Sequence, residues 1–443
     1  MSFARYPAYK DRGVEWLGEV PGHWEVLPLK AGFDIVGGST PKSEKEAYWD
    51  GDIVWVTPSD LSKLDSIGIS DSIRKITAQG LASCGTSMVP PDSIVLSTRA
   101  PIGSLAIAKT DLCTNQGCKS LVPRELVVSR FFAHLLSIST AELNIRGRGT
   151  TFLELSADEL GAFKTGFPPK AEQQAIATFL DIETAKIDGL MAEQRALVAL
   201  LKEKRQAVIS HAVTKGLNPA APMKDSGVAW LGEVPGHWEV RAIKHIVSTP
   251  VTDGPHETPD FPDEGIPFVS AEAVSSGSID FNKIRGYISE LDHIKYSQKY
   301  RPQMGDVYMV KSGATTGITA IVETDRDFNI WSPLAVIRCG RSSLPHFVLN
   351  FMRSRHFLEA ITLNWSFGTQ QNIGMGVIEN LAVTVPPIEE QKAIAAYLNH
   401  QTTQLDTLTQ EAQTAIALLQ ERRTALISAA VTGKMDVRAA MTA

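Results

Sequence analysis

Two stretches of the chain, residues 168–216 and 386–434, place apolar residues at alternating steps of three and four. In the first stretch this spacing selects Ile176, Leu180, Glu183, Ile187, Leu190, Gln194, Leu197, Leu201, Lys204 and Val208. In the second it selects Ile394, Leu398, Gln401, Leu405, Leu408, Ala412, Ala415, Leu419, Arg422 and Leu426. A narrow apolar stripe is typical of a coiled-coil seam, so we predict two long helices that face each other. The alternative is two unrelated surface helices, each packed on its own domain.

The same two stretches are copies of one another. They align without a gap at an offset of 218, with 23 identical residues in 49 positions. Both begin with a Pro-Pro pair and end near a glycine, which are residues that start and stop helices. A second repeated block, GVEWLGEVPGHWEV at 13–26, recurs at 227–240 with one change, Glu15 against Ala229. One unit is therefore used twice in this chain.

The segments between the repeats have a different pattern. Residues 27–167 (globule 1) and 241–385 (globule 2) contain short β-type runs broken by Gly, Pro, Ser and Asp, such as 52–56, 93–97, 266–269 and 306–310. Each predicts a compact α/β or α+β globule. Their sequences have diverged, although 91–108 can be laid over 305–322 without a gap. We divide the chain into 1–26, globule 1 (27–167), a central helix (168–216), a linker with the repeated block (217–240), globule 2 (241–385), a C-terminal helix (386–434) and a tail (435–443).

Composition limits the class of protein. The chain has 443 residues, 43% hydrophobic and 21% charged, as expected of a soluble protein with two or three domains. No apolar run is long enough to span a membrane or to act as a secretory signal, so we expect a cytoplasmic protein. The cysteines Cys84, Cys113, Cys118 and Cys339 lack zinc-site spacing and are expected to be buried or free thiols. A net charge of -6 argues against a protein that coats DNA, unless basic residues gather on one face or partners supply phosphate contacts.

Several motifs together carry a resemblance to a known family. They are WLGEVPGHWEV at the start of each half, PPxxEQxxIAxxL at the start of each helix, residues 37–41, Thr98-Arg99 before Ile102-Gly103, 115–117, 253–256 and 368–372. Any one motif is weak, but their order, given twice over essentially the whole chain, is specific. The chain resembles the specificity subunit of type I restriction-modification systems.

The resemblance implies a function without catalysis. Each globule would be a target-recognition domain that reads one half of an asymmetric bipartite site in double-stranded DNA, and an antiparallel helix pair would set the distance between them. Two modification subunits would transfer methyl groups from S-adenosylmethionine, and restriction subunits would use ATP and Mg²⁺. The chain itself has no phosphate-binding loop, no methyltransferase tetrapeptide and no nuclease carboxylate cluster in its sequence. An enzyme with unrecognised motifs, or a coiled-coil adaptor that binds no DNA, remain alternatives.

Base reading requires side chains that form paired hydrogen bonds, and phosphates accept from Lys, Arg, Ser and Thr. In globule 1 the candidates in turn-like contexts are Lys42, Thr57, Ser59, Arg99, Asn115, Gln116, Lys119, Arg146, Arg148 and Thr150. In globule 2 they are His256, Lys311, Ser312, Thr369, Gln370, Gln371 and Asn372. The tryptophans and histidines of the repeated blocks, Trp16, His23, Trp24, Trp230, His237 and Trp238, occur in both halves alike, so we expect them to pack at the helix–globule junction.

Overall fold

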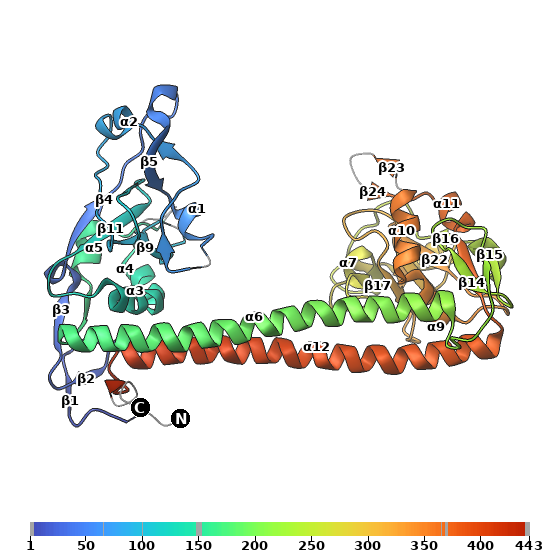
Figure 1. Cartoon of the computed structure of the whole chain (residues 1–443). Helices are drawn as coiled ribbons and strands as arrows, with labels where there is room; N and C mark the ends of the chain where they lie inside the picture. The colour runs from blue at the N-terminus through green and yellow to red at the C-terminus, as the bar shows by residue number, and fades with distance from the viewer. Residues whose placement is uncertain are drawn as a thin grey trace. The chain divides into compact units, whose positions relative to one another are not determined.

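The computed structural model describes residues 4–64, 66–99, 101–147, 153–364, 366–367 and 371–438. The chain divides into two compact units, which we call unit 1 (Met1–Gln194 with Ala415–Ala443) and unit 2 (Arg195–Thr414). Each unit contains one globule and a part of both long helices, α6 (Lys170–Lys215) and α12 (Ile388–Val431) (Figure 1). The predicted fold class, two mixed globules joined by two long repeated helices, is confirmed.

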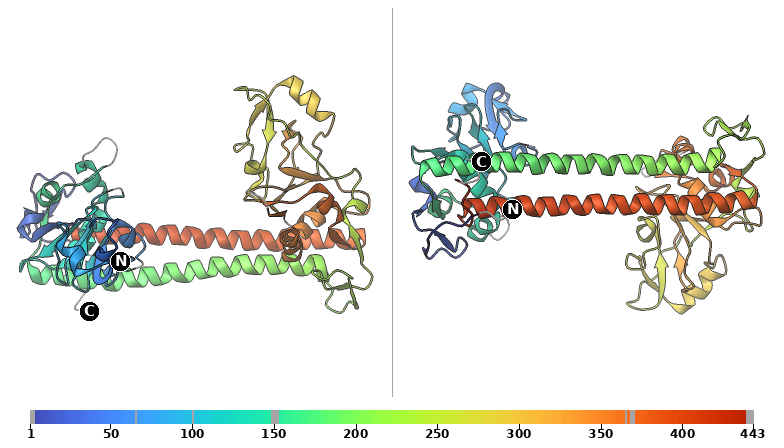
Figure 2. Two further views of the ribbon diagram at one scale, coloured as in Figure 1. Left: turned by 90° about the horizontal axis from the view of Figure 1, so that it is seen from above. Right: turned by 60° about the horizontal axis from the view of Figure 1, so that its bottom comes forward.

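The two helices pair in antiparallel directions within each unit. In unit 1, Ile176 of α6 shares a core with Val431 of α12, while further along α6 Asp188 accepts from Arg423 Nε at 2.9 Å. In unit 2, Arg205 Nε donates to Asp406 at 3.0 Å, and later residues of α6 share a core with earlier residues of α12. Both views of Figure 2 show the helices side by side in each unit.

The predicted helix seam is half right. Leu180, Ile187 and Leu201 are buried as predicted, but Leu190 and Leu197 are 46% and 42% exposed. In place of the predicted positions 183, 190 and 197, the helix buries the next residue along the chain each time. These residues are Thr184, Met191 and the partly buried Val198. Similarly, Leu408 of α12 is exposed where the pattern placed it in the seam.

The error has a physical cause. Starting from a given leucine, a step of three and a step of four lead to neighbouring positions, and the pattern alone does not say which of the two is buried. The correct stripe carries threonines, which look too polar for a seam. Thr184 and Thr402 each donate their hydroxyl to the carbonyl four residues earlier, at 2.6 and 2.7 Å, so the polar group is satisfied inside its own helix.

Two larger sheets form the frame of globule 1. A five-stranded sheet has the order β4-β11-β8-β9-β6, and a three-stranded sheet has the order β10-β5-β7. The helix α3 (Ser129–Ile138) packs on β9 and, in Figure 1, lies between the sheet and α6. The strands are β4 (Phe33–Gly37), β5 (Trp49–Val56), β6 (Gly68–Ile69), β7 (Lys75–Ile76), β8 (Ile94–Ser97), β9 (Leu105–Ala108), β10 (Cys113–Thr114) and β11 (Cys118–Pro123).

Globule 2 repeats this topology with a different sequence. Its sheets have the orders β16-β22-β19-β20 and β18-β17-β21, which correspond to β4-β11-β8-β9 and β7-β5-β10. The helix α9 (Pro345–Met352) takes the place of α3. The strands are β16 (Thr252–Asp253), β17 (Ile266–Val269), β18 (Gly286–Ile288), β19 (Val307–Val310), β20 (Thr319–Ile321), β21 (Asn329–Ile330) and β22 (Leu334–Ile337).

The strand registers correct one detail of the sequence alignment. Ile94 of β8 faces Ile107 and Leu121, and Val307 of β19 faces Ile321 and Ile337. The loop between β19 and β20 is therefore one residue longer than the loop between β8 and β9. For this reason 91–108 and 305–322 do not match without a gap.

The repeated motifs build the junction between each globule and its helix. The Glu172 carboxylate on α6 is 6% exposed and accepts from Trp24 Nε1 at 3.0 Å, from Tyr6 Oη at 2.6 Å and from His23. The next residue, Gln173, accepts from the backbone N–H of Val128, at the start of α3.

The second copy makes the same contacts with fewer partners. Glu390 accepts from Trp238 Nε1 at 3.0 Å and lies 2.8 Å from His237 Nε2, and Gln391 accepts from Leu344 N. The predicted packing role of Trp24 and Trp238, both fully buried, is confirmed. In the part of the chain that the structure describes, no helix has the length and apolarity needed to cross a membrane.

Candidate nucleic-acid interface

One group of predicted residues in globule 1 gathers where β8 ends. Thr98 N donates to Gly117 O at 2.8 Å, and Leu155 N donates to Thr98 O at 2.9 Å, so three loops lie side by side here. Arg99 follows Thr98 and forms an ion pair with Glu154, with 3.1 Å between Nη2 and Oε2. The side chains of Arg99 and Glu154 are 44% and 40% exposed, so both can be reached from solvent.

Further candidates flank the loop. Asn115 Oδ1 accepts from Gly117 N at 3.0 Å, which makes Asn115 a residue that shapes its own turn. Gln116 accepts a hydrogen bond from the Thr40 hydroxyl. Lys119 lies opposite Gly37 in the neighbouring strand. The structure therefore brings Arg99, Asn115, Gln116 and Lys119 together, and adds Thr40, which the sequence analysis missed.

The remaining candidates of globule 1 are placed differently. Thr57 is the N-cap of α1 (Pro58–Leu61), and its hydroxyl is committed to Asp60 at 2.5 Å, while Ser59 is exposed in the same short helix. Lys42 is exposed in the loop after β4, and Arg146 ends α4 (Thr140–Arg146), 4.0 Å from Glu159. Among the described residues, no hydrogen bond or ion pair joins Lys42 or Arg146 to the Arg99 group. Arg148 and Thr150 lie outside the described residues.

A corresponding group forms in globule 2, where β19 ends. Lys311 O accepts from Ile373 N at 2.9 Å, and Ser312 pairs with Asn372 through an isolated β-bridge. Gln371 and Asn372 form β24 (Gln371–Asn372), which pairs with β23 (Ser366–Phe367). Thr369 and Gln370 lie outside the described residues.

Asp253, at the end of β16, links this group to further charges. Its carboxylate is 8% exposed and lies 3.3 Å from Lys311 Nζ, 3.1 Å from His256 Nε2 and 2.5 Å from Lys299 Nζ. Sequence analysis missed Lys299, although its segment, Lys295 to Tyr300, interleaves lysines with tyrosines as many nucleic-acid sites do.

The two groups occupy equivalent positions in the two globules. The strand registers and the hydrogen bonds of Thr98 and Lys311 define the equivalence. Both also rest on a glycine that lies hard against a neighbouring strand end: a Cβ on Gly38 would come 2.1 Å from Asn115 O, and one on Gly254 would come 2.0 Å from Ile330 O. The equivalent pairs are Gly37 and Asp253, Thr98 and Lys311, Arg99 and Ser312, and Glu154 and Asn372. The scaffold is shared, and the chemistry presented on it differs at all four positions.

The junctions below the globules differ too. In unit 1, Arg130 and His134 of α3 lie 2.6 and 3.1 Å from Asp181 of α6. Burial works to raise the pKa of Asp181, but hydrogen bonds and charge from His134 and Arg130 outweigh burial and leave that pKa below its usual value.

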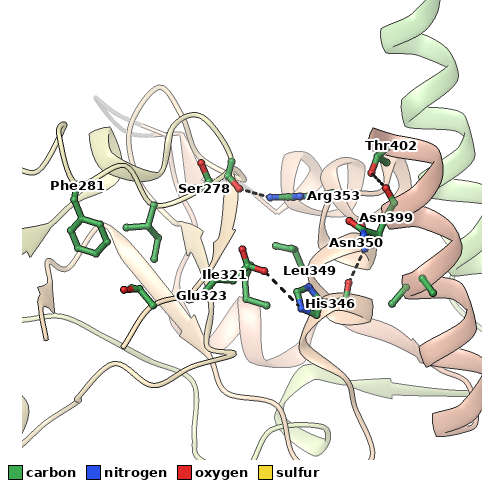
Figure 3. A pocket seen from close by; sticks show the side chains of 15 residues that line it. Ser278, Phe281, Ile321, Glu323, His346, Leu349, Asn350, Arg353, Asn399 and Thr402 are labelled. Atoms are coloured by element: carbon green, nitrogen blue, oxygen red, sulfur yellow. Dashed lines mark hydrogen bonds and ion pairs between the residues drawn. The ribbon is translucent and has the colours of Figure 1, made fainter. Parts of the chain in front are cut away.

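In unit 2 the equivalent residues are His346, Asn350 and Asn399, and they line an open cleft of about 620 Å³ (Figure 3). Arg353 also faces the cleft, and its guanidinium donates to the carbonyl oxygens of Gly277 and Thr319. Across the described residues, His, Cys, Asp and Glu side chains form no group of three that could hold a metal ion.

Comparison with known proteins assigns the family. The model of the type I restriction modification DNA specificity domain matches twice, at residues 21–197 and 235–417, which is most of the chain. The chain is 28% identical over 382 residues to the type I restriction enzyme MjaIX specificity subunit of Methanocaldococcus jannaschii, covering 84% of this chain and 85% of that one. It is 21% identical over 441 residues to the EcoKI specificity subunit of Escherichia coli, covering 95% and 91%.

Solved structures agree on the fold. The HsdS subunit from Thermoanaerobacter tengcongensis superposes with a TM-score of 0.53 at 18% identity, over 94% of this chain and 98% of that one. A chain from a study of complex assembly and conformational transition of the type I R-M system gives a TM-score of 0.72 at 18% identity, over 93% and 98%. With two family domains in one chain and relatives that align over nearly their full length, this protein belongs to the family of type I restriction-modification DNA specificity subunits.

Proposed function

We propose that this protein selects the DNA sequence for a type I restriction-modification complex, with globule 1 reading one half of a bipartite site and globule 2 reading the other. One observation carries the proposal: equivalent loop groups on a shared scaffold present different side chains. A framework that is repeated in both halves supplies position, and divergent loops supply specificity.

The chemistry of the loops suits base reading. Arginine forms paired hydrogen bonds with guanine in the major groove, and asparagine and glutamine form them with adenine. Globule 1 offers Arg99 and Gln116 from adjoining loops, while globule 2 offers Asn372 at the position equivalent to Glu154. Because the two sets differ in donors and acceptors, the half-sites they read are expected to differ, and the whole site to be asymmetric.

The proposal places catalysis on partner subunits. Methyl transfer with S-adenosylmethionine belongs to two modification subunits, and ATP- and Mg²⁺-dependent cleavage to restriction subunits. This division also accounts for the net charge of -6, since partners can supply many of the phosphate contacts that dominate affinity for DNA. A cytoplasmic location follows from the role.

Exposed leucines on the helices offer places for the two modification subunits. In unit 1, Leu190 of α6 and Leu418 of α12 are 46% and 61% exposed. The pairing of Asp188 with Arg423 puts these leucines within about one helical turn of each other along the helix pair. Leu190 lies nine residues beyond Asp181, which is about half a turn round the helix from the side that meets the globule.

The repeat places the same pair of leucines in unit 2, where Leu200 and Leu408 are 62% and 48% exposed. Two equivalent apolar patches fit two copies of one partner. In a reconstituted complex, the variant L190E/L418E should bind one modification subunit instead of two, as measured by native mass spectrometry. L200E/L408E should do the same, and the four-fold variant should bind none. A control variant, L291E in globule 2, should keep both subunits. Two bound subunits in the four-fold variant would contradict this docking site.

The function is tested by the methylated motif. A host that carries this chain and its modification partner should methylate a bipartite, asymmetric sequence, and methylome sequencing should show that motif disappear when this chain is deleted. The purified chain alone should neither methylate nor cleave DNA, and should bind it weakly until modification subunits join. Methyl transfer by the isolated chain would favour an enzyme, and assembly without sequence-specific methylation would favour an adaptor.

A further inference from the structure

Globule 2 contains a carboxylate surrounded by more positive charge than it can neutralise. Asp253 is nearly buried, and its two oxygens are shared by Lys299, Lys311 and His256. Burial works to raise the pKa of Asp253, but hydrogen bonds and charge from Lys299 and Lys311 outweigh burial and leave that pKa below its usual value. The carboxylate is therefore ionised at neutral pH and fixes the cations around it.

The three neighbours of Asp253 differ in their access to solvent. The Lys311 side chain is 11% exposed and lies beneath the surface, whereas Lys299 and His256 are 45% and 70% exposed. Lys299 also donates to the Gly254 carbonyl at 3.0 Å, so two acceptors hold its ammonium in one place. An ammonium that is held in position and still open to solvent can accept an anionic ligand with little further loss of side-chain freedom.

A small cavity lies beside Lys299. It measures about 150 Å³ and is lined by Asp253, Gly254, Tyr296 and Lys299, together with the ion pair of Lys295 with Glu257. Two lysines and two carboxylates line this hollow. Lys311 lies 3.3 Å from Asp253 outside the lining, so the three lysines exceed the two carboxylates by one positive charge.

The cluster is not needed to build the strands that carry it. Globule 1 forms the equivalent strands β4 and β8 with Gly37 in place of Asp253 and Thr98 in place of Lys311. A buried carboxylate and a buried lysine are costly to bring out of water, and ion pairs of this kind are weak evidence for a gain in stability. The cluster belongs to what distinguishes globule 2, which is the surface it presents.

We propose that Lys299 and His256, held in place by Asp253, bind a backbone phosphate of the DNA beside the half-site that globule 2 reads. Asp253 is a positioning residue, and Lys311 adds charge from below. This inference rests on the proposed function. A phosphate fits better than a base edge because the lysine ammonium is a compact point charge without the planar fork that pairs with a base edge.

The test uses the complex of this chain with its modification subunits and a duplex that carries the methylated motif. Fluorescence anisotropy at several salt concentrations gives the affinity and its salt dependence. The variant K299Q should weaken binding several-fold, equally for the cognate duplex and a scrambled one, and should lower the salt slope by about one. The methylated motif should stay the same. K244Q is the matched control, because Lys244 donates to the neutral Asn380 side chain at the base of the globule and should leave the slope unchanged.

The variant D253N separates positioning from charge. Loss of a negative charge should by itself tighten binding to DNA, whereas loss of a positioning residue should weaken binding despite the added positive charge. We expect a several-fold loss of affinity. The control D263N removes an equally charged but exposed carboxylate from the same globule and should bind as tightly as the wild type or more so.

Each outcome decides a separate point. Tighter binding by D253N, or an unchanged salt slope in K299Q, would overturn the phosphate site. The proposed function would still stand if the wild-type complex bound the motif sequence-specifically. A wild-type complex without sequence preference would contradict the proposed function instead. If a lowered thermal midpoint shows that D253N does not fold properly, K299Q still decides the inference. The Lys299 side chain is half exposed, and its replacement leaves the Asp253–Lys311 pair in place.

Discussion

The two globules share seven strands in the same order, to which globule 1 adds β6. The loops at the ends of β8 and β19 differ between the globules. Arg99 pairs with Glu154 in globule 1, and Ser312 pairs with Asn372 at the same place in globule 2. The central strands β8, β19 and β22 are buried at every position, and in each globule a glycine touches a neighbouring strand end. Loop residues carry no such constraint. This scaffold separates the strands, which must stay constant, from the loops, which can vary.

The junctions between globule and helix share one contact and differ in others. The glutamate that binds the tryptophan and histidine is present in both units, but unit 1 adds Tyr6 as a further donor. Unit 1 also closes its α3 contact with Asp181, where unit 2 has Asn399 and an open cleft. Unit 1 is therefore expected to hold its globule more firmly, and this difference can be measured.

Exchange of a whole globule should produce the largest change in the DNA sequence that is read. Replacement of residues 27–167 by the corresponding globule of a relative should replace one half of the methylated motif and leave the other half unchanged. The reason is that each loop group belongs to one globule and is held by its own strands. Methylome sequencing provides the measurement. Simultaneous change of both half-sites would break the assumption that the globules read independently.

Removal of the junction glutamates should give the largest effects on stability. E172A leaves the buried Tyr6 hydroxyl and Trp24 indole without an acceptor, and should cost about 3–5 kcal/mol in the free energy of unfolding of unit 1. E390A strands one buried indole and an exposed histidine, and should cost unit 2 about 2 kcal/mol.

Urea unfolding followed by tryptophan fluorescence, with hydrogen exchange to assign each unit, measures both losses. The control E193A removes an exposed glutamate of α6 and should change the free energy by under about 0.5 kcal/mol. Equal losses for E172A and E390A would remove the contrast between the junctions.

Substitution of single loop residues tests what the loops read. R99A should cost about 1–3 kcal/mol in binding and relax one base position in the half-site of globule 1, because a paired hydrogen bond to a base would be lost. S312A, at the equivalent position, should have a smaller effect confined to the other half-site. The degeneracy of the methylated motif reports both. Uniformly weaker methylation with no relaxed position would mean that Arg99 contacts a phosphate.

Acid should distinguish the two junctions by a smaller amount. The pKa of Asp181 is lowered in the folded state, so its ion pairs stabilise unit 1 above the unfolded pKa of about 4 and are lost as pH falls through the folded value. D181N should therefore lower the free energy of unfolding of unit 1 by about 1 kcal/mol at pH 7. It should change nothing at a pH low enough to protonate Asp181 in both the folded and the unfolded wild type. Unit 2 has Asn399 at this place and should lack this dependence. Unfolding midpoints from pH 7 to pH 2.5 check the prediction, and a constant gap between D181N and wild type would refute it.

Sequence predicted the repeat, the fold class and the packing of Trp24 and Trp238, because these depend on local pattern and on identity between copies. It placed half of the helix seam one residue early, because the exposed Leu190 and Leu197 look more like seam residues than Thr184 does. Arg99, Asn115, Gln116 and Lys119 were among ten candidates that sequence offered for globule 1, and only the folded loops show that these four lie near one another.

Other features could not be reached from sequence. Lys299 and Asp253 are 46 residues apart and meet only through the folded sheet. The hydroxyl of Thr57 is used by a helix cap, which depends on the backbone conformation of that one residue. Such contacts arise from tertiary geometry, and no periodicity or composition reports them.

The ion pairs between the helices have a consequence for symmetry. Asp188 pairs with Arg423 and Arg205 pairs with Asp406, and the offset of 218 turns each pair into the other. Such a surface is isologous, because each copy contributes the same aspartate and the same arginine to the contact with the other. A chain with a single copy of the repeat would contain both members of the pair and could satisfy them by binding its twin. The long chain therefore carries the interface of a homodimer inside one polypeptide, in which the two halves are free to become different.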